Sequence, residues 1–309
     1  MSDALEAVDA LPEIDAPVNP SLDGRPTLVI SDMHLGSVGA PRAKSLRPLW
    51  QGVQRVVVNG DLAEIQTIKR RAEAAKEARR MVEMCDHDGV ELITIPGNHD
   101  AYVSEQRYAT AGEGQVLIMH GDALHPDIAP WSSGVKQIRQ AKADMNYDTD
   151  ANFDAEDPLD ERIAASHHMA VAEFDRREVG GVADRLSVLL APHRVFKVVR
   201  YWKQVPDLAG KFLDRYKPET KVLIFGHSHR QGVWRRGGRV LINTGSFSFP
   251  GRPRAVRLDQ GVVSVFRIRK TKGEHRLSER PLMVHNTSET GVAPSGHTDV
   301  ADALAAAAE

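Results

Sequence analysis

Five short segments of this chain combine side chains that bind metal ions with positions at which buried strands are expected to end. Each follows a short, nearly unbroken apolar run rich in β-branched residues, which is the pattern of a strand buried on both faces. The segments are Asp32-Met33-His34, Gly60-Asp61, Gly97-Asn98-His99-Asp100, His120-Gly121-Asp122 and Gly226-His227-Ser228-His229. Open α/β sheets place their binding sites at the carboxyl ends of their strands. We therefore expect these segments to lie on loops at that edge and to form one site.

The side chains in these segments suit a pair of neighbouring divalent cations. Two adjacent cations need one ligand that bridges them, and a carboxylate with two oxygens serves best. Imidazole nitrogens and carboxylate or amide oxygens suit Mn, Fe, Zn, Ni or Co. Asp32 and His34 can point to one side because residues two apart share a side in extended chain, and the same holds for His227 and His229. The only cysteine, Cys85, lies in a predicted helix, which argues against a structural zinc site.

The five segments resemble the motifs of the calcineurin-like metallophosphoesterase superfamily, in the same order. The family motifs D-x-H, G-D-x-x-[DE], G-N-[HR]-[DE], H-G-D and G-H-x-H read here DMH, GDLAE, GNHD, HGD and GHSH. The resemblance covers roughly residues 25–270. It implies an α/β fold of the metallophosphoesterase type, in which a β-sandwich is flanked by helices in α/β/β/α layers. The segment Asn243-Thr244-Gly245-Ser246 is also similar to the N-P-G-S turn of many members, with Thr244 in place of the proline.

The resemblance also implies a role for each residue of the site. The ligands of the first metal ion would be Asp32, His34, Asp61 and His229. The ligands of the second ion would be Asp61, Asn98, His120 and His227, with Asp61 shared by both ions. His99 would be a catalytic histidine that binds neither ion and is oriented by Asp32 or its neighbours. Manganese is the expected metal, and Fe, Zn, Ni and Co are alternatives.

This family assignment implies a hydrolase that cleaves a phosphodiester or pyrophosphate bond. A hydroxide bridging the two metal ions would attack phosphorus, and His99 would assist the leaving group. The H-G-D motif followed by a long helical insertion is most similar to the UDP-2,3-diacylglucosamine hydrolases, whose insertion caps the acyl chains of their substrate. The best-known members of that group carry GNRD where this chain has GNHD.

Two alternatives to that substrate stay open. A phosphodiesterase or nucleotide hydrolase of the same fold explains the residues equally well. The other alternative belongs to a different functional class: a protein of this fold that only binds partners and does not catalyse. This chain, however, keeps His99 and every expected ligand. We therefore expect a small-molecule phosphoester or pyrophosphate as partner, such as a nucleotide-linked lipid. Peripheral contact with a membrane is an open option, and no nucleic-acid partner is expected.

The composition agrees with a soluble enzyme. With 309 residues, of which 41% are hydrophobic, the chain can bury a substantial core. Its formal net charge of −2 does not indicate a nucleic-acid binder. A single cysteine excludes a disulfide scaffold and fits a reducing compartment, so we predict a cytoplasmic location. Neither a signal peptide nor an apolar stretch long enough to span a bilayer is visible.

Periodicity and composition divide the chain into regions. We predict a flexible N-terminal arm, a catalytic domain and a polar, disordered C-terminal tail, at residues 1–24, 25–270 and 271–309. A helix is predicted over about 65–85, with the length of a crossover between parallel strands. Hairpin turns are predicted at 237–238 and 260–261, where glycines separate apolar runs.

Residues 130–215 are predicted to form a helical insertion beside the metal-binding edge. Helices are expected over 159–179 and 182–216, interrupted at Pro192 and Pro206. Long insertions at a catalytic rim often serve as lids or substrate pockets. The second helix carries a basic row that can be a phosphate-binding surface or an ordinary solvated face, formed by Arg194, Lys197, Arg200 and Lys203.

Three histidines outside the five segments have open roles. His125 lies three residues beyond Asp122 and can line the site. His167 and His168 are interpreted as surface residues of a helix, with metal binding as the alternative.

Overall fold

Two β-sheets form the centre of the molecule in this computed structural model, which describes residues 19–145, 158–175, 192–248 and 251–287. The strands of the first sheet are, in spatial order, β11 (Glu274–Leu277), β10 (Val262–Thr271), β9 (Arg254–Asp259), β1 (Thr27–Ile30), β2 (Arg55–Asn59) and β3 (Glu91–Ile95). A further strand, β12 (Met283–Asn286), also pairs with β10. The second sheet contains β4 (Tyr108–Ala111), β5 (Val116–Met119), β6 (Val222–Phe225), β8 (Arg239–Asn243) and β7 (Gly232–Arg236). Parallel pairing joins β1, β2 and β3 in one sheet and β5, β6 and β8 in the other.

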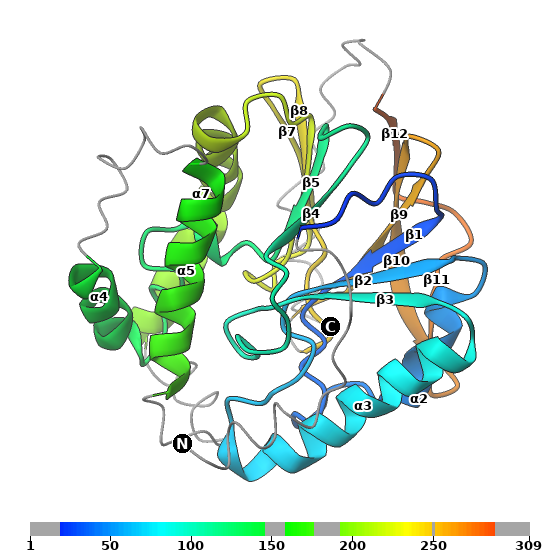
Figure 1. The fold of residues 1–309 in the computed structure, drawn as a ribbon, viewed down its shortest axis with the longest axis horizontal. Helices are drawn as coiled ribbons and strands as arrows, with labels where there is room; N and C mark the ends of the chain where they lie inside the picture. Colours follow the sequence, from blue (N-terminus) through cyan, green and yellow to red (C-terminus); the bar gives the residue numbers. More distant parts are fainter. Residues whose placement is uncertain (1–18, 146–157, 176–191, 249–250, 288–309) are drawn as a thin grey trace.

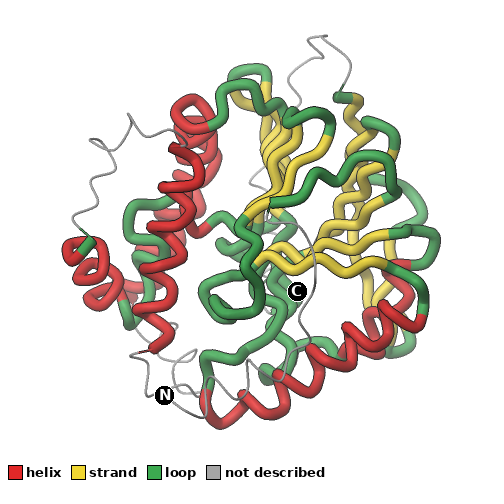
Figure 2. Tube along the Cα trace, viewed as in Figure 1, coloured by secondary structure: helices red, strands yellow, loops and turns green. Residues whose placement is uncertain are grey.

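Helices cover the outer face of each sheet (Figure 1). The first sheet is covered by α2 (Ala43–Leu46), the 3₁₀ turns η1 (Arg47–Trp50) and η2 (Ile68–Arg70), and α3 (Arg71–His87). The second sheet is covered by η3 (Asp122–Leu124), α5 (Pro158–Asp175) and α7 (Pro192–Tyr216), with α4 (Val135–Asp144) packed on α5. Figure 2 shows the helices outside the two sheets. The fold is therefore the α/β/β/α sandwich that the family resemblance predicts.

Strand β2 shows why the apolar runs are unbroken. Alternate residues of a strand point to opposite faces. Val57 packs between the two sheets with Ile118 and Ile224, whereas Val56 and Val58 belong to the apolar cluster under α2 and α3. Both faces are buried, so the three central positions of the strand are all valine. The same division holds in β6, where Ile224 faces the other sheet and Leu223 faces α7.

Helix α3 covers the first sheet with one narrow stripe. Ala74, Ala78, Met81 and Cys85 are fully buried at helical spacing, and the charged residues face solvent except Glu77, which is buried and accepts the N–H of Ala43 at 2.8 Å. The helix begins at Arg71 rather than near residue 65, because the chain first passes through the turn η2. The predicted hairpin turns are present: Gly237 and Gly238 join β7 to β8, and Gln260 and Gly261 join β9 to β10, all with positive φ.

The helical insertion differs from its prediction at one proline. Helix α7 runs across Pro206, so an interruption there is wrong, whereas Pro192 does begin the helix. A proline inside a helix leaves the carbonyl four residues earlier without its N–H donor. Here that carbonyl belongs to Trp202, and the Arg230 guanidinium donates to it at 2.7 Å. The part of the predicted helices at 176–191 lies outside the described residues.

Parts of both predicted terminal regions are ordered. A disordered tail at 271–309 is wrong for residues 274–286, because β11 and β12 pair with the long strand β10 and extend the first sheet. The predicted arm also contacts the domain, since Leu22 is buried and its N–H donates to the carbonyl of Thr110 at 2.7 Å. Short polar strands are hard to predict because their stability comes from the partner strand. Residues 1–18 and 288–309 lie outside the described part of the chain.

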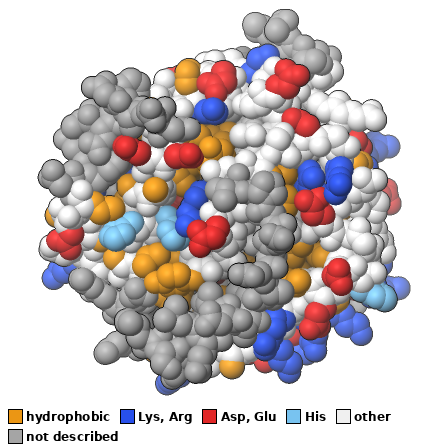
Figure 3. All heavy atoms as spheres, in the orientation of Figure 1, with side chains coloured by type: hydrophobic (Ala, Val, Ile, Leu, Met, Phe, Trp, Pro, Cys, Tyr) orange, Lys and Arg blue, Asp and Glu red, His pale blue; other side chains and the backbone are white. Residues whose placement is uncertain are grey.

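The surface carries mixed charges. Figure 3 shows acidic and basic side chains interspersed on the face seen in Figure 1, in agreement with the net charge of −2. Among the described residues, no helix is long and apolar enough to cross a membrane.

The inter-sheet core should dominate stability. Ile118 is fully buried between the sheets, and Ile118→Ala should lower the free energy of unfolding by about 2–5 kcal/mol, because it removes apolar contacts and leaves a cavity. Val284 in β12 is 56% exposed, and Val284→Ala should change that free energy by less than about 0.5 kcal/mol. Urea denaturation of both variants followed by circular dichroism measures the difference. Equal losses would show that the sheets do not pack through this cluster.

Candidate metal centre

The five segments meet at one edge of the sandwich. Asp32 follows β1, Asp61 follows β2 and Asn98 follows β3 in the first sheet. His120 follows β5 and His227 follows β6 in the second sheet. Because the parallel strands of both sheets end at this edge, every candidate ligand lies within four residues of the end of its strand. The predicted location at the carboxyl ends of strands is therefore the observed one.

Four side chains form the first group of donor atoms. One atom each from Asp32, His34, Asp61 and His229 lies within 4.8 Å of all the others. The Nε2 atoms of His34 and His229 are 3.1 Å apart, and His34 Nε2 is 3.5 Å from Asp61 Oδ2. His229 Nε2 is 3.4 Å from Asp32 Oδ1. Asp32, His34 and Asp61 are buried and His229 is half-buried, so the group is largely shielded from water.

The remaining candidates form a second group beside the first. His227 Nδ1 lies 3.1 Å from Asn98 Oδ1 and 3.2 Å from His120 Nε2. His120 Nε2 is in turn 3.7 Å from Asp61 Oδ2. The same Asp61 oxygen therefore faces histidines of both groups. All seven candidate ligands come together around this carboxylate.

The atoms of the second group that face one another all carry lone pairs when both imidazole rings are neutral. His227 Nε2 donates to the carbonyl of Ile128 at 2.9 Å, so the neutral ring has its lone pair on Nδ1. Likewise, His120 Nδ1 lies 3.2 Å from the carbonyl of Asn59, which leaves the lone pair on Nε2. Lone pairs on His227, His120 and Asn98 and a charge on Asp61 thus converge. A divalent cation fits this donor set, because imidazole nitrogens and carboxylate and amide oxygens are ligands that such ions prefer.

The pKa values agree with a site that attracts positive charge. Burial lowers the pKa of His227 to about 4, so its ring is neutral at pH 7. Burial also opposes the charged form of His120, but Asp61 and Asp32 outweigh it and raise the pKa of that ring. Burial raises the pKa of Asp32 to about 6, and the neighbouring Asp61 acts in the same direction. Carboxylates that attract a proton onto His120 attract a metal ion for the same reason.

The backbone at the site is strained. Five of the seven candidate ligands have positive φ although none is glycine: Asp32 (51°), His34 (48°), Asp61 (53°), His227 (63°) and His229 (58°). This region is uncommon for such residues, and residues held there cluster at functional sites. Asp32 and His34 do share a side as predicted. The cause is a pair of left-handed residues rather than the extended chain that the spacing suggests.

Asp100, the last residue of G-N-H-D, holds two of the loops together. Its carboxylate accepts the backbone N–H groups of Gly97 at 2.8 Å, Ala63 at 3.1 Å and Asp61 at 3.2 Å. Burial raises the pKa of Asp100 to about 6, and the charge of Asp61 adds to this. The sequence assigns Asp100 no role beyond its place in the motif. The structure makes it the residue that orients Asp61 through the backbone.

Glu64, the acid of G-D-x-x-E, pairs with His99. His99 Nδ1 is 2.9 Å from Glu64 Oε1, and the His34 ring packs edge-on against the His99 ring at 4.8 Å, so Glu64 is a hydrogen-bonding partner that the prediction did not name. Burial disfavours the charged form of Glu64, but His99 and His34 outweigh it and hold the pKa well below its usual range. His34, Glu64 and His99 also bring three donor atoms within 4.8 Å. The motif position of Glu64 is the signal that points to this role.

Asn243 and Thr244 support the G-H-S-H loop. Asn243 Nδ2 donates to the carbonyl of Gly226 at 2.7 Å and to Ser228 Oγ at 3.0 Å. Thr244 Oγ1 lies 2.6 Å from Ser31 Oγ, and Ser31 donates to the Asp32 carboxylate. The threonine that replaces the usual proline therefore adds a hydrogen-bonded link to the first group of donor atoms.

His125, His167 and His168 lie outside the two groups. His125 packs edge-on against Tyr201, with ring centroids 5.7 Å apart. His167 is half-buried and its Nε2 donates to the carbonyl of Ala101 at 2.6 Å, so the interpretation as a surface residue is wrong for it. His168 is exposed, as expected.

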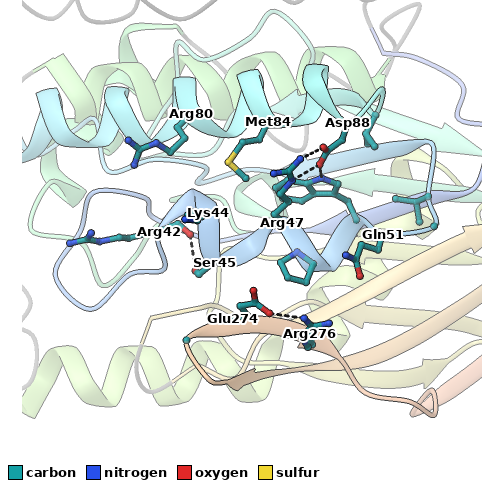
Figure 4. Close-up of a pocket in the computed structure, with 16 residues that line it drawn as sticks. Arg42, Lys44, Ser45, Arg47, Gln51, Arg80, Met84, Asp88, Glu274 and Arg276 are labelled. Atoms are coloured by element: carbon teal, nitrogen blue, oxygen red, sulfur yellow. Dashed lines mark hydrogen bonds and ion pairs between the residues drawn. The ribbon is translucent and has the colours of Figure 1, made fainter.

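A separate cleft of about 1060 Å³ lies between η1, α3 and β11 and contains none of the candidate ligands. Figure 4 shows that its basic side chains are partly neutralised, with Arg47 on Asp88 and Arg276 on Glu274. Trp50 also donates to Asp88, at 2.9 Å. Arg80 pairs with Glu77 at 2.9 Å, so three of the five basic side chains at the cleft are in ion pairs.

Comparison with known proteins identifies the family. The chain matches the family model of the calcineurin-like phosphoesterases over residues 25–231, more than half of its length, and it belongs to this family. Together with the donor atoms, this membership indicates divalent metal binding. No curated protein matches the sequence significantly.

Several solved structures are similar in fold. A predicted phosphoesterase from Streptococcus pneumoniae TIGR4 is 15% identical with a TM-score of 0.35, and the match covers 85% of this chain and 97% of that one. Vps29 from Entamoeba histolytica, complexed with zinc, is 12% identical with a TM-score of 0.40, covering 85% and 99%. Yfce, a phosphoesterase from E. coli, is 14% identical with a TM-score of 0.38, covering 85% and 100%. These values are too low to transfer an activity, a ligand or a partner.

The close approach of Gly60 to His120 provides a test of the centre. A Cβ atom at Gly60 would lie 1.9 Å from His120 Nδ1, so Gly60→Ala must displace that ring. We expect the affinity for Mn²⁺ to fall by about 10–100-fold, as when the support of a metal ligand is lost. Gly24→Ala is the matched control, because Gly24 has nearly the same φ (83° against 82°) but open space around its Cβ position. Isothermal titration calorimetry compares the two, and equal affinities would remove His120 from the centre.

Proposed function

We propose that this protein is a dinuclear-metal-dependent phosphoesterase that hydrolyses a phosphodiester or pyrophosphate bond. The observation that carries the proposal is the position of Asp61 Oδ2, which lies 3.5 Å from His34 Nε2 on one side and 3.7 Å from His120 Nε2 on the other. A carboxylate shared by two groups of nitrogen and oxygen donors is the ligand that two adjacent cations require. Family membership supports the same reaction class.

In this proposal each group of donor atoms holds one ion. The first ion is bound by Asp32, His34, Asp61 and His229. The second ion is bound by Asp61, Asn98, His120 and His227. Manganese is the preferred metal, with Fe, Zn, Ni or Co as alternatives, since all accept this mixture of ligands. When bound, such ions lower the pKa of a water molecule toward neutrality and neutralise charge on the phosphoryl oxygens.

His99 is the proposed proton donor to the leaving group. Its Nδ1 donates to Glu64, which leaves Nε2 as the atom that exchanges a proton. The side chain is 23% exposed, so a substrate can reach it, whereas Glu64 is buried. The low pKa of Glu64 keeps that carboxylate charged, so it accepts the Nδ1 hydrogen bond as an anion. The backbone N–H of His99 donates to Asp61 Oδ1 at 3.0 Å and so links His99 to the shared ligand.

The substrate is proposed from the helices beside the site. The start of α7 exposes the apolar side chains of Phe196 and Val199, each followed by an exposed basic residue, Lys197 and Arg200, a combination suited to an amphipathic anion. This supports a UDP-2,3-diacylglucosamine pyrophosphatase-like enzyme, with a nucleotide-linked lipid as substrate. A phosphodiesterase or nucleotide hydrolase is the second candidate. The single buried cysteine, Cys85, supports a cytoplasmic location for either enzyme.

The shared ligand gives the direct test of this function. Purified protein with added Mn²⁺ should hydrolyse an aryl phosphodiester, and a panel of nucleotides and UDP-linked lipids should show which substrate is preferred. Asp61→Ala should abolish turnover and sharply lower the occupancy of both metal sites, because both lose a ligand at once. Metal analysis by mass spectrometry measures the occupancy. A variant that kept two equivalents and near-normal turnover would contradict the assignment.

His99 should be needed for chemistry but not for metal binding. His99→Asn should keep both ions and lose about 10²–10⁴ in rate, the usual range for a general acid. The loss should shrink for substrates with better leaving groups, which need no proton. The rate ratio between an aryl and an alkyl phosphodiester measures this dependence. Loss of metal without a leaving-group effect would instead place His99, beside His34 and Glu64, among the ligands.

A further inference from the structure

Two helices outside the five motifs hold the backbone of three metal-site loops. In α5, the Arg162 Nη2 atom donates to the carbonyls of Ala123 at 2.6 Å and His125 at 2.9 Å, just after the H-G-D motif. In the same helix, His167 donates to the carbonyl of Ala101, just after G-N-H-D. Each bond fixes a peptide plane within three residues of a motif. These helices thus contact the site through side chains that the motifs do not include.

Helix α7 makes the most direct of these contacts. The Trp202 indole Nε1 donates to the carbonyl of Ser228 at 2.8 Å. Ser228 lies between His227 and His229, and both histidines have positive φ. The carbonyl of Ser228 shares its peptide plane with the nitrogen of His229. Fixing that carbonyl therefore limits rotation about φ of His229, which is 58°.

A second bond returns from the loop to the same residue of the helix. Arg230 directly follows His229, and its Nη1 donates to the carbonyl of Trp202 at 2.7 Å. That carbonyl is free for Arg230 because the residue four positions later is Pro206, which has no N–H. Trp202 is thus both donor and acceptor to one loop. Pro206, which was expected to interrupt the helix, leaves the carbonyl of Trp202 available as the acceptor for Arg230.

Aromatic packing extends the contact to the second group of donor atoms. The Trp131 ring lies 5.4 Å from the ring of His227 and 4.7 Å from that of Tyr201 in α7. Tyr201 is buried and directly precedes Trp202 in the sequence. Helix α7 therefore contacts Trp131, which in turn packs against His227. The geometry points to a specific role: we propose that Trp202 and Arg230 are positioning residues that hold the G-H-S-H loop in its strained, metal-binding form. This proposal rests on the proposed ligand roles of His227 and His229.

The consequence is that the helical insertion sets metal affinity and does not only select substrate. A loop with two left-handed residues relaxes unless its surroundings hold it. Loss of the indole N–H would leave the carbonyl of Ser228 without this donor and let His229 turn away from Asp32 and His34. Groups that orient metal ligands typically change metal affinity by 10–100-fold when removed. A helix that only covers substrate would leave metal affinity unchanged.

The test compares two Trp→Phe variants of the full chain. Trp202→Phe keeps an aromatic ring but removes the N–H, and we expect the dissociation constant for Mn²⁺ to rise by about 10–100-fold. Trp50→Phe is the matched control, because Trp50 also donates one indole hydrogen bond, to Asp88 at 2.9 Å, in the cleft remote from the centre. Calorimetric titration of the metal-free proteins gives both constants. Thermal melting of the metal-free proteins shows whether stability has changed in parallel.

Arg230→Met provides a second variant in case Trp202→Phe does not fold. Arg230→Met removes the hydrogen bond to the carbonyl of Trp202 and should also weaken Mn²⁺ binding. In Trp202→Phe, excess Mn²⁺ should restore turnover of an aryl phosphodiester. Wild-type affinity in both variants would overturn the proposal, and so would an equal loss in Trp50→Phe. Wild-type protein that binds Mn²⁺ but hydrolyses nothing would refute the proposed hydrolase alone, since the affinities still test positioning. Wild-type protein that binds no Mn²⁺ would overturn both.

Discussion

The structure depends on one buried carboxylate that must meet positive charge. Burial alone would raise the pKa of Asp61, but His120, His99 and His34 outweigh it and hold that pKa below its usual range. Removing a charge from water without a partner is among the most costly changes in a protein interior. The chain offers the rings of His34 and His120, at 3.5 Å and 3.7 Å, and the backbone N–H of His99 to this carboxylate. The raised pKa of His120 reflects the same attraction for positive charge that a divalent cation would satisfy.

The two-sheet architecture makes that convergence possible. Each sheet contributes three parallel strands, and their carboxyl ends lie at the same edge. Asn59, at the end of β2, donates across to the carbonyl of Met119 at 2.8 Å and so ties the sheets together beside the site. Glycines then let the loops approach closely: a Cβ at Gly97 would lie 2.2 Å from Asp61 Oδ1. The packing that stabilises the fold thereby also determines which side chains can share one ion.

The sequence predicts the elements that have a local pattern of residues. It misses those that are stabilised by contacts with residues distant in the sequence. The unbroken apolar runs and the D-x-H to G-H-x-H motifs predict the buried strands and the convergence of their loops. Residues 274–286 appear polar and disordered because their pairing with β10 has no local signature. The pairing of Glu64 with His99 is a contact across 35 residues, and the rescue of the Trp202 carbonyl by Arg230 crosses 28. Such contacts follow from packing, which periodicity does not describe.

The contacts of α7 also limit how the insertion can move. Opening the helix as a rigid lid would break the bonds that join Trp202 to Ser228 and Arg230, and each buried group left without a partner costs about 1–3 kcal/mol. The part from Trp202 onward is therefore fixed to the metal-site loop. The preceding turns differ, because Phe196 is 67% exposed and Val199 is 39% exposed. The helix is therefore divided: its first turns expose apolar side chains to solvent, whereas the part from Trp202 onward is bonded to the G-H-S-H loop.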